Sequence, residues 1–363
     1  MIELFPDLHD RPKTRDVLRS LMRHVCSTGM QPGEKFPTQP ELRELFGFHN
    51  NTLTPAMKIL EECGLLERRR KYGTVLRREV ETTDIPGLWR VGMAISEDVA
   101  ITPFYGQLFH FLHHRLRQAG ITLRHYISSG VEEPGVKRFS KFDQLDEDLS
   151  EARLDLVLSM VGLPAADVRH WEERHIPVVH VGSDQSALCG AIIEQSRMVR
   201  EAVALLAGQG VRRIALVCVK DGHDGFWKAF RHAMGEFELP CEPHQLHLTG
   251  TGPQEGRRVS ERILSLPKAR RPEALIITDD RVASGLAAFF ANESTYRPTL
   301  IVRTNRQAPL AFALPVMHFE MDIDELARQA ADLCRHRLLD PSAAPRRIFV
   351  GTKLADKATS YLR

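Results

Sequence analysis

Four consecutive cationic side chains occupy positions 68–71, within the stretch ERRRKYG. Guanidinium and ammonium groups neutralise backbone phosphates, so a run of this kind is one way in which a protein holds nucleic acid. A solvated turn between two strands would have the same composition. Residues 1–80 contain 14 Lys and Arg against 11 Asp and Glu, a modest basic surplus that the rest of the chain lacks. The elements that position the run have to distinguish the two interpretations.

Two helices are predicted upstream of the cationic run. A stripe of apolar residues across 14–28 indicates the first, with Thr14 as its N-cap. Thr38 and Glu41 have the spacing of a capping box and indicate the start of the second. Gly47 closes this helix, since glycine readily adopts the left-handed conformation in which helices end.

A third helix is predicted directly before the run, capped by His49 or Asn50 and ended by Gly64. Its inward apolar stripe consists of Leu53, Ala56, Met57 and Leu60. Residues 65–66 and 74–76 have the composition of two strands, which places the cationic run in the turn of a β-hairpin. Three helices and a hairpin make a winged helix-turn-helix, whose third helix enters a major groove of DNA.

Residues 29–76 resemble the DNA-binding domain of the GntR family. The matching positions are Pro32, Gly33, Phe36, Pro37, Leu42, Gly47, Ala56, Leu60, Gly64, Leu65, Gly73 and Thr74. Two departures concern DNA contacts: the family's usual Ser-Arg is His49-Asn50 here, and Lys71 replaces a common glycine of the wing. Asparagine reads an adenine edge and arginine prefers guanine, so the family's operator preference does not transfer to this chain.

The resemblance implies a set of DNA-contacting residues. The expected phosphate contacts are Lys35, Arg68, Arg69, Arg70 and Lys71. The expected positioning or base contacts are Thr38, Gln39, Asn50, Asn51 and Thr52. Tyr72 and Gly73 complete the predicted wing. Pro55 lies inside the third helix, where it removes a backbone donor and is expected to bend the helix.

Beyond residue 88 the chain alternates between strand-like and helix-like segments. Apolar runs at 89–95, 154–161, 214–219 and 274–278 predict strands, with amphipathic segments between them. This alternation is typical of parallel sheets covered by helices. About 275 residues exceed a single doubly wound domain, so two lobes are expected.

This second region resembles the periplasmic-binding-protein-like effector domain of the LacI family. The matching segments are 101–105 (ITPFY), 176–179 (IPVV), 225–230 (GFWKAF), 279–285 (DDRVASG), 313–315 (ALP) and a last helix over 324–338. With its GntR-like head, the chain is therefore similar to GntR/LacI hybrid regulators, the type that includes arabinose repressors. The resemblance implies a ligand held between the lobes by loops at strand ends.

The effector contacts implied by position are Phe104, Asp184, Trp227, Asp280 and Asn305. Asn305 falls where sugar-binding members often have a hydroxyl-binding Asp, and Phe104 would stack on a sugar ring. Core packing is the competing interpretation for the aromatic residues. The family's frequent Arg is Gly222 here and Asp279 replaces an Asn, so a polyol ligand would be held by an altered set of groups.

The expected organisation is a DNA-binding domain over 1–78, a linker over 79–87 and a two-lobed domain over 88–363. Lobe 1 is expected at about 88–185 and 316–340, and lobe 2 at about 186–315 and 345–363. We expect a homodimer on pseudo-palindromic operator DNA, because two-fold protein symmetry matches two-fold site symmetry. The expected effector is a sugar or sugar derivative, acting by induction or by corepression.

Other classes of protein are disfavoured. No apolar run reaches the roughly 18 residues of a membrane span, a secretory signal is absent, and the cysteines form no CxxC pair. A cytoplasmic protein with reduced thiols is expected. Two clusters invite a metal interpretation, but their spacing on a helix or a strand does not converge, and we expect neither metal nor cofactor: His110, His113 and His114; Cys241, His244 and His247. A metabolite-processing enzyme or a ligand-independent regulator is the alternative.

Overall fold

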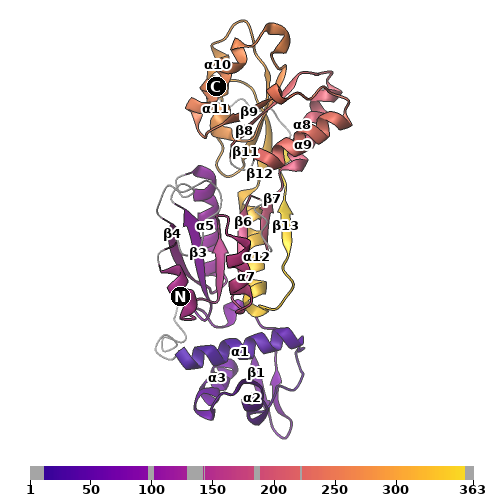
Figure 1. Cartoon of the computed structure of the whole chain (residues 1–363). Coiled ribbons are helices and arrows are strands. Elements are labelled where there is room, and N and C mark those ends of the chain that lie inside the picture. The colour runs from indigo at the N-terminus through magenta and orange to yellow at the C-terminus, as the bar shows by residue number, and fades with distance from the viewer. Residues whose placement is uncertain are drawn as a thin grey trace.

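The computed structural model of the chain describes residues 12–96, 102–128, 142, 144–183, 189–220 and 223–355. Three bodies follow one another along an elongated molecule: the head (12–78), lobe 1 and lobe 2 (Figure 1). The predicted winged helix and the predicted two-lobed α/β domain with parallel sheets are both confirmed. No helix in the described ranges is both long and apolar enough to span a bilayer.

The head contains three helices and a hairpin, as predicted. The bounds are α1 Pro12–Thr28, α2 Gln39–Phe46, α3 Asn50–Glu62, β1 Leu66–Arg69 and β2 Gly73–Leu76. The backbone N–H and the hydroxyl of Thr38 donate to Glu41 Oε2 at 2.6 and 2.8 Å, and Gly47 ends α2 with a φ of 69°. The predicted N-cap at Thr14 is wrong: α1 begins at Pro12, because proline suits the first turn of a helix, and Thr14 is buried within α1. Helix α3 continues through Pro55 to Glu62.

In its described residues lobe 1 contains a six-stranded sheet in the order β13-β7-β6-β5-β3-β4, and all five pairs of neighbouring strands are parallel. The strands are β3 Arg90–Ser96, β4 Thr122–Ser128, β5 Leu156–Ser159, β6 Val178–Gly182, β7 Gly190–Ile193 and β13 Arg347–Val350. The helices are α5 Pro103–Gln118, α6 Leu145–Ser150, α7 Ala165–Glu172 and α12 Ile323–Leu339. Helices α5 and α12 cover one face, and α6 and α7 cover the other.

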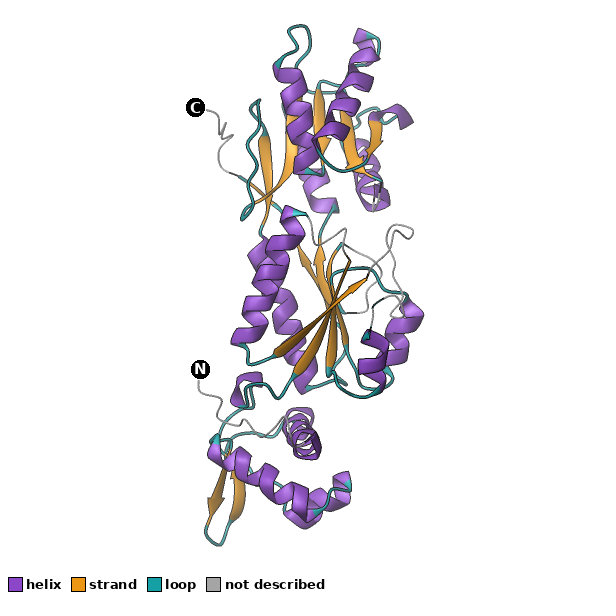
Figure 2. Cartoon of the chain, turned by 90° about the vertical axis from the view of Figure 1, so that its left-hand side faces the viewer, coloured by secondary structure: helices purple, strands orange, loops and turns teal. Residues whose placement is uncertain are grey.

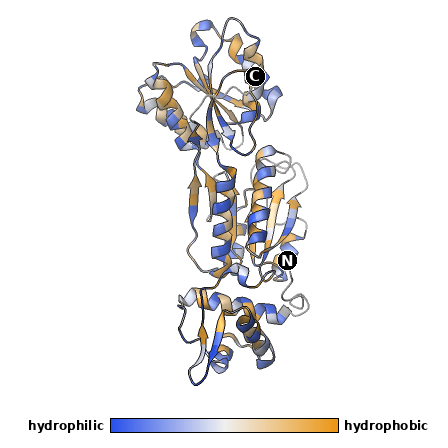
Figure 3. Cartoon of the chain, turned by 180° about the vertical axis from the view of Figure 1, so that it is seen from behind, coloured by the Kyte–Doolittle hydropathy of each residue, from blue (hydrophilic) through white to orange (hydrophobic). Residues whose placement is uncertain are grey.

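Lobe 2 repeats this arrangement with a described sheet of six strands in the order β14-β12-β11-β10-β8-β9. The strands are β8 Ile214–Val219, β9 Leu246–Thr249, β10 Ala274–Ile277, β11 Thr299–Asn305, β12 Met317–Met321 and the antiparallel edge strand β14 Lys353–Leu354. The helices are α8 Ser196–Gly208, α9 His223–Glu236, α10 Pro253–Ser265 and α11 Asp280–Ala291, with 3-10 turns at η4 Pro243–Gln245 and η5 Lys268–Arg270. Helices α8 and α9 pack on one face and α10 and α11 on the other, around strands that are the most apolar part of the lobe (Figures 2 and 3).

The described chain passes between the lobes three times, after β7, after β12 and after β13. Two of the crossings touch, since the Glu194 N–H donates to the Val350 carbonyl at 2.9 Å. The lobe limits expected near 185, 315 and 345 are therefore displaced. Strands β7 and β13 pair in the sheet of lobe 1, and β12 and β14 pair in the sheet of lobe 2. Lobe 1 therefore comprises 88–193 and 323–350, and lobe 2 comprises 194–322 and 351–355.

The segment expected to be a linker is packed against both neighbours. It contains a 3-10 turn, η2 Thr82–Asp84, and the side chains of Thr82, Ile85 and Leu88 are fully buried. The apolar cores of the head and of lobe 1 form one continuous cluster across it. The head and lobe 1 are thus joined by a core rather than by a flexible tether.

Helix α1 is the part of the head that faces lobe 1, and it docks there through charged side chains (Figure 1). Asp155, directly before β5, accepts from Arg15 Nη2 at 2.6 Å and from the Arg90 backbone N–H at 2.8 Å, and also pairs with Arg19. Arg23 donates to the Leu338 carbonyl. The Asp155 carboxylate is 1% exposed, so this contact is a buried ion cluster.

Candidate functional site

The amino end of α3 presents exposed polar side chains on the side opposite its buried stripe. Asn50 and Asn51 are exposed and Thr52 is half-buried. The His49 carbonyl accepts the N–H groups of Thr52 and Leu53 at 3.0 Å, which fixes the start of the helix. Within the described ranges the amides of Asn50 and Asn51 make no hydrogen bond, so their donors and acceptors are available to a base edge.

The wing divides the cationic run into paired and unpaired side chains. Arg68 Nε donates to Glu61 of α3 at 2.6 Å, and Arg69 pairs with Glu67 at 3.2 Å. Arg70 and Lys71, in the turn after β1, have no ion-pair partner among the described residues. The tip of the hairpin therefore carries the positive charge that is free to bind phosphate.

Lys71 has a φ of 66°, in the left-handed region that glycine adopts without strain. This explains the common glycine of the family at this position, and it shows that the chain retains a lysine there at a conformational cost of about 1–2 kcal/mol. Gly73 has a φ of 108°, and a Cβ at this position would lie 3.2 Å from Lys35 Cε. The end of the Lys35 side chain therefore lies against the start of β2, next to the turn that contains the exposed Tyr72.

Thr38 and Gln39 lie at the start of α2. Both Thr38 donors are used by Glu41, and the backbone hydrogen bond is the main cause of the lowered pKa of Glu41. Thr38 is therefore a capping residue whose role is to fix α2, while the half-buried Gln39 follows it in the first turn.

Two of the predicted effector residues meet at the carboxyl ends of neighbouring lobe-2 strands. Asn305, the last residue of β11, donates from Nδ2 to Asp280 Oδ2 at 2.7 Å, and Asp280 begins α11 after β10. Asp280 is buried, and this burial, reinforced by Asp279 and opposed by Arg303, raises the pKa of Asp280 to about 6. The pair therefore offers a carboxylate oxygen and an amide oxygen at the edge where the lobes face each other.

The aromatic candidates are held by their neighbours. Phe104, in the first turn of α5, packs edge-to-face on Tyr105 with ring centres 4.9 Å apart. Trp227 in α9 stacks on Phe230 at 5.6 Å and packs against the lobe-2 core, which favours a packing role for Trp227. Asp184 lies outside the described residues.

The sequence-based reasoning missed three residues near this edge. Arg303 lies in the carboxyl-terminal half of β11, Tyr105 in the first turn of α5 and His180 in the middle of the short strand β6. A Cβ on Gly182 would lie 3.7 Å from the Tyr105 hydroxyl and 3.8 Å from His180 Nε2, so these two side chains adjoin. In the sequence, only the nearness of these residues to strand ends or to a helix start could have indicated a site. The fold is what brings them together.

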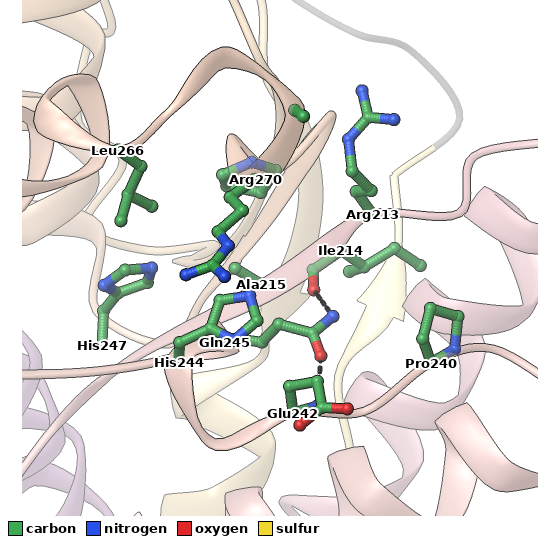
Figure 4. A pocket seen from close by; sticks show the side chains of 12 residues that line it. Arg213, Ile214, Ala215, Pro240, Glu242, His244, Gln245, His247, Leu266 and Arg270 are labelled. Carbon is green, nitrogen blue, oxygen red and sulfur yellow. Dashed lines mark hydrogen bonds between the residues drawn. The ribbon is translucent and has the colours of Figure 1, made fainter.

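A second hollow of about 210 Å³ lies at the opposite, amino-terminal ends of β8 and β9 (Figure 4). Gln245 spans its floor, donating from Nε2 to the Ile214 carbonyl at 2.7 Å. His244 and His247 line it, whereas Cys241 does not. Over the described residues no three metal-binding side chains converge, either here or at His110, His113 and His114.

Comparisons with known proteins match both parts of the chain. Residues 13–76 match the family model for bacterial regulatory proteins, gntR family, and residues 203–360 match that for a periplasmic binding protein-like domain. Residues 13–76 are thus similar to the gntR family and residues 203–360 to periplasmic binding protein-like domains. The two matches support the predicted hybrid of a GntR-type head and a periplasmic-binding-protein-like domain.

The head of this hybrid is 36% identical over 67 residues to the HTH-type transcriptional repressor YtrA of Bacillus subtilis (strain 168). The alignment covers 18% of this chain and 52% of YtrA, so the chain spans about half the length of that repressor.

The effector domain has the fold of solved LacI-family structures. A LacI regulator from Bacillus cereus subsp. cytotoxis NVH 391-98 aligns with a TM-score of 0.62 and 14% identity, covering 73% of this chain and 96% of that one. A LacI-family regulator from Lactobacillus casei with bound sucrose aligns with a TM-score of 0.57 and 20% identity, covering 73% and 98%. At these identities the similarity establishes the fold alone.

Proposed function

We propose that the protein is a homodimeric transcriptional repressor that binds pseudo-palindromic operator DNA, and that a small polar metabolite between its lobes sets its DNA affinity. The observation that carries the proposal is the head surface, where, among the described residues, the start of α3 has unpaired amides and the wing that follows α3 has unpaired cations at its tip. Base readout and phosphate contact are the two tasks of such a surface. The ligand class we propose is a sugar or sugar derivative, and the sucrose-bound relative supports it.

The DNA half of the proposal is tested with operator fragments selected from random DNA by the full-length protein. Replacing Arg70 and Lys71 with Ala should weaken binding to every sequence and reduce the slope of log affinity against log salt by about 0.9 per lost phosphate contact. Replacing Lys268 and Arg270, exposed cations of lobe 2, provides the matched control. An unchanged slope in the wing variant would exclude the wing as a DNA contact.

Base readout is tested separately by Asn50→Ala. This variant should keep its salt slope and lose base preference at one position of each half-site, at a cost of about 1–3 kcal/mol for the preferred base. Equal preference in variant and wild type would remove Asn50 from the readout set. Analytical ultracentrifugation of the complex tests the dimer, because a monomer on a single half-site contradicts the proposed symmetry.

The regulatory half is tested by thermal shift with sugars, polyols and nucleosides. A ligand at about 100 times its dissociation constant adds about 2.7 kcal/mol, which such a screen detects. Asp280→Ala and Asn305→Ala should retain operator binding and lose the response to the ligand, since a ligand shifts an equilibrium only by its differential affinity. Stabilisation that survives both substitutions would place the ligand elsewhere.

A further inference from the structure

Arg303 is a half-buried cation that lacks an anionic partner in the part of the chain that the structure describes. It lies near the carboxyl end of β11, and its guanidinium carbon is 5.6 Å from the ring centre of Phe226 in α9. Within the described residues Arg303 forms neither an ion pair nor a side-chain hydrogen bond. By contrast, two buried arginines, Arg15 and Arg337, and two half-buried ones, Arg19 and Arg115, each pair with a carboxylate. A partly desolvated charge of this kind favours an anion that arrives with a ligand.

The charge of Arg303 acts on both lobes. Burial raises the pKa of the Tyr105 hydroxyl in lobe 1, and Arg303 opposes that rise. Burial likewise raises the pKa of Asp280 in lobe 2, again with Arg303 acting in the opposite direction. Tyr105 is in the first turn of α5 and Asp280 starts α11, so Arg303 lies where the two lobes face each other.

The geometry around Arg303 leaves its hydrogen-bond donors usable. An aromatic ring over a guanidinium occupies the flat face of the group, while its N–H groups point outward in the plane. These coplanar donors match the two oxygens of a carboxylate or phosphate. Phe226 therefore lies against Arg303 without taking up its hydrogen-bond donors.

The neighbouring groups suit a hydroxylated ligand. Among the described residues the Tyr105 hydroxyl makes no hydrogen bond, and Asp280 with Asn305 offers acceptors for ligand hydroxyl groups. Asp280 has one oxygen bound to Asn305, and no ion pair between Asp280 and Arg303 is formed. Cation and hydroxyl-binding groups are thus separate parts of one site.

We propose that the effector is an acidic polyol, a sugar acid or a sugar phosphate, whose anionic group binds Arg303 while its hydroxyl groups bind Asp280, Asn305 and Tyr105. This proposal rests on the proposed function, because it concerns the same inter-lobe site. It narrows the ligand class from sugars in general to sugars that carry a carboxylate or a phosphate.

The test uses matched ligands on the full-length protein: glucose, glucuronate and glucose 6-phosphate, with ribose and ribose 5-phosphate as a second set. Calorimetry should detect binding of at least one acid, with its neutral parent bound at least tenfold more weakly. The carboxylate and phosphate members separate the two sources of the anion. A charged hydrogen bond contributes about 1.5–3 kcal/mol, so Arg303→Gln should weaken the acid about 10- to 150-fold and leave the neutral sugar unchanged.

Two further variants keep the test interpretable. Arg303→Lys retains the charge without the planar donors and should bind the acid with intermediate affinity. Arg297→Gln removes a cation just before the amino end of the same strand and should bind it as the wild type does. Retained operator binding shows that each variant is folded.

The outcomes separate this inference from the proposed function. Equal affinity for acid and neutral parent, wild-type affinity in Arg303→Gln, or no binding by any acid would each overturn the acidic-ligand inference. A neutral sugar that binds as tightly as its acid and shifts operator affinity would overturn the acidic-ligand inference but would support the proposed regulatory function. An Arg303-dependent acid that never alters operator affinity would support the site and overturn the regulatory function.

Discussion

Removing the Asp155 charge is expected to release the head from lobe 1. This single carboxylate compensates two buried guanidinium groups, Arg15 and Arg19, and also accepts the Arg90 backbone N–H. Burial lowers the pKa of Arg15 and of Arg19 to about 10, so both remain charged at neutral pH. Asp155→Asn retains the shape and one acceptor, but it leaves the buried Arg15 without an anion and Arg19 with only the half-exposed Asp16.

The expected cost follows from that arrangement. Breaking a buried ion pair from one side costs about 3–5 kcal/mol, and the remaining amide acceptor places this case near about 3 kcal/mol. For a unit the size of the head together with lobe 1, a loss of about 3 kcal/mol in the free energy of unfolding corresponds to a fall in melting temperature of roughly 6–12 °C. Arg15 still donates to the Leu88 carbonyl at 2.9 Å, which limits the effect to the charge itself.

Hydrogen exchange with mass spectrometry, combined with urea unfolding, measures this change by region. Protection should fall in residues 15–23 and 82–90, with lobe 2 unaffected. Asp16→Asn is the control, because the Asp16 carboxylate is 52% exposed and its pair with Arg19 contributes about 0–1 kcal/mol. Pairing Asp155→Asn with Arg15→Gln should cost less than the sum of the single changes, since the two residues are coupled.

A free energy of unfolding of Asp155→Asn within about 0.5 kcal/mol of the wild-type value, with unchanged hydrogen exchange, would show that Asp155 does not hold the head on lobe 1. If Asp155 does hold the head on lobe 1, the heads released in Asp155→Asn should still bind operator DNA, and the ligand should lose its influence on that binding. Operator titrations with and without the cleft ligand measure this second effect.

Three further predictions address single positions. Lys71→Gly should stabilise the head by up to about 1 kcal/mol by relieving the left-handed backbone, while reducing the salt slope of DNA binding by about one unit. Folding raises the pKa of Asp280 from 3.8 to about 6, so its contribution to stability falls as the pH rises through this range. In urea unfolding, the free energy of unfolding of Asp280→Asn should therefore increase relative to that of the wild type by up to about 3 kcal/mol across the same range. A pH-independent difference would contradict this. Gly285→Ala should destabilise lobe 2 by about 3 kcal/mol or more, because its Cβ would lie 1.9 Å from the Pro253 carbonyl oxygen; thermal unfolding of the variant measures it.

The head was predictable because its signals are local. Thr38 and Glu41 are close in sequence, and the capping hydrogen bonds join these same two residues. Gly47 adopts the left-handed backbone that its position implies. The alternation of strands and helices likewise predicts two parallel sheets, since each unit is built from neighbouring residues.

The features that join the parts were not predictable, because their partners are distant in sequence. Arg15 and Asp155 are separated by 140 positions, and within its own helix Arg15 looks like part of a solvated face. Arg303 resembles any polar residue at the end of a strand until Phe226 and Tyr105 are placed beside it. The sequences of the short strands β7 and β13 do not show which lobe they belong to. Their pairing with each other in the lobe-1 sheet does.

The packed segment between the head and lobe 1 constrains how such a protein can exchange its parts. A recombination event or an engineered chimera that joins a foreign head at residue 79 would remove the cover from Ile85, Leu88 and Trp89, which are fully buried here. It would also leave Asp155 without its cations unless the new first helix carried basic residues at the positions of Arg15 and Arg19. The unit of inheritance is therefore the head together with its matching lobe surface, and a functional graft has to transplant both sides of that contact.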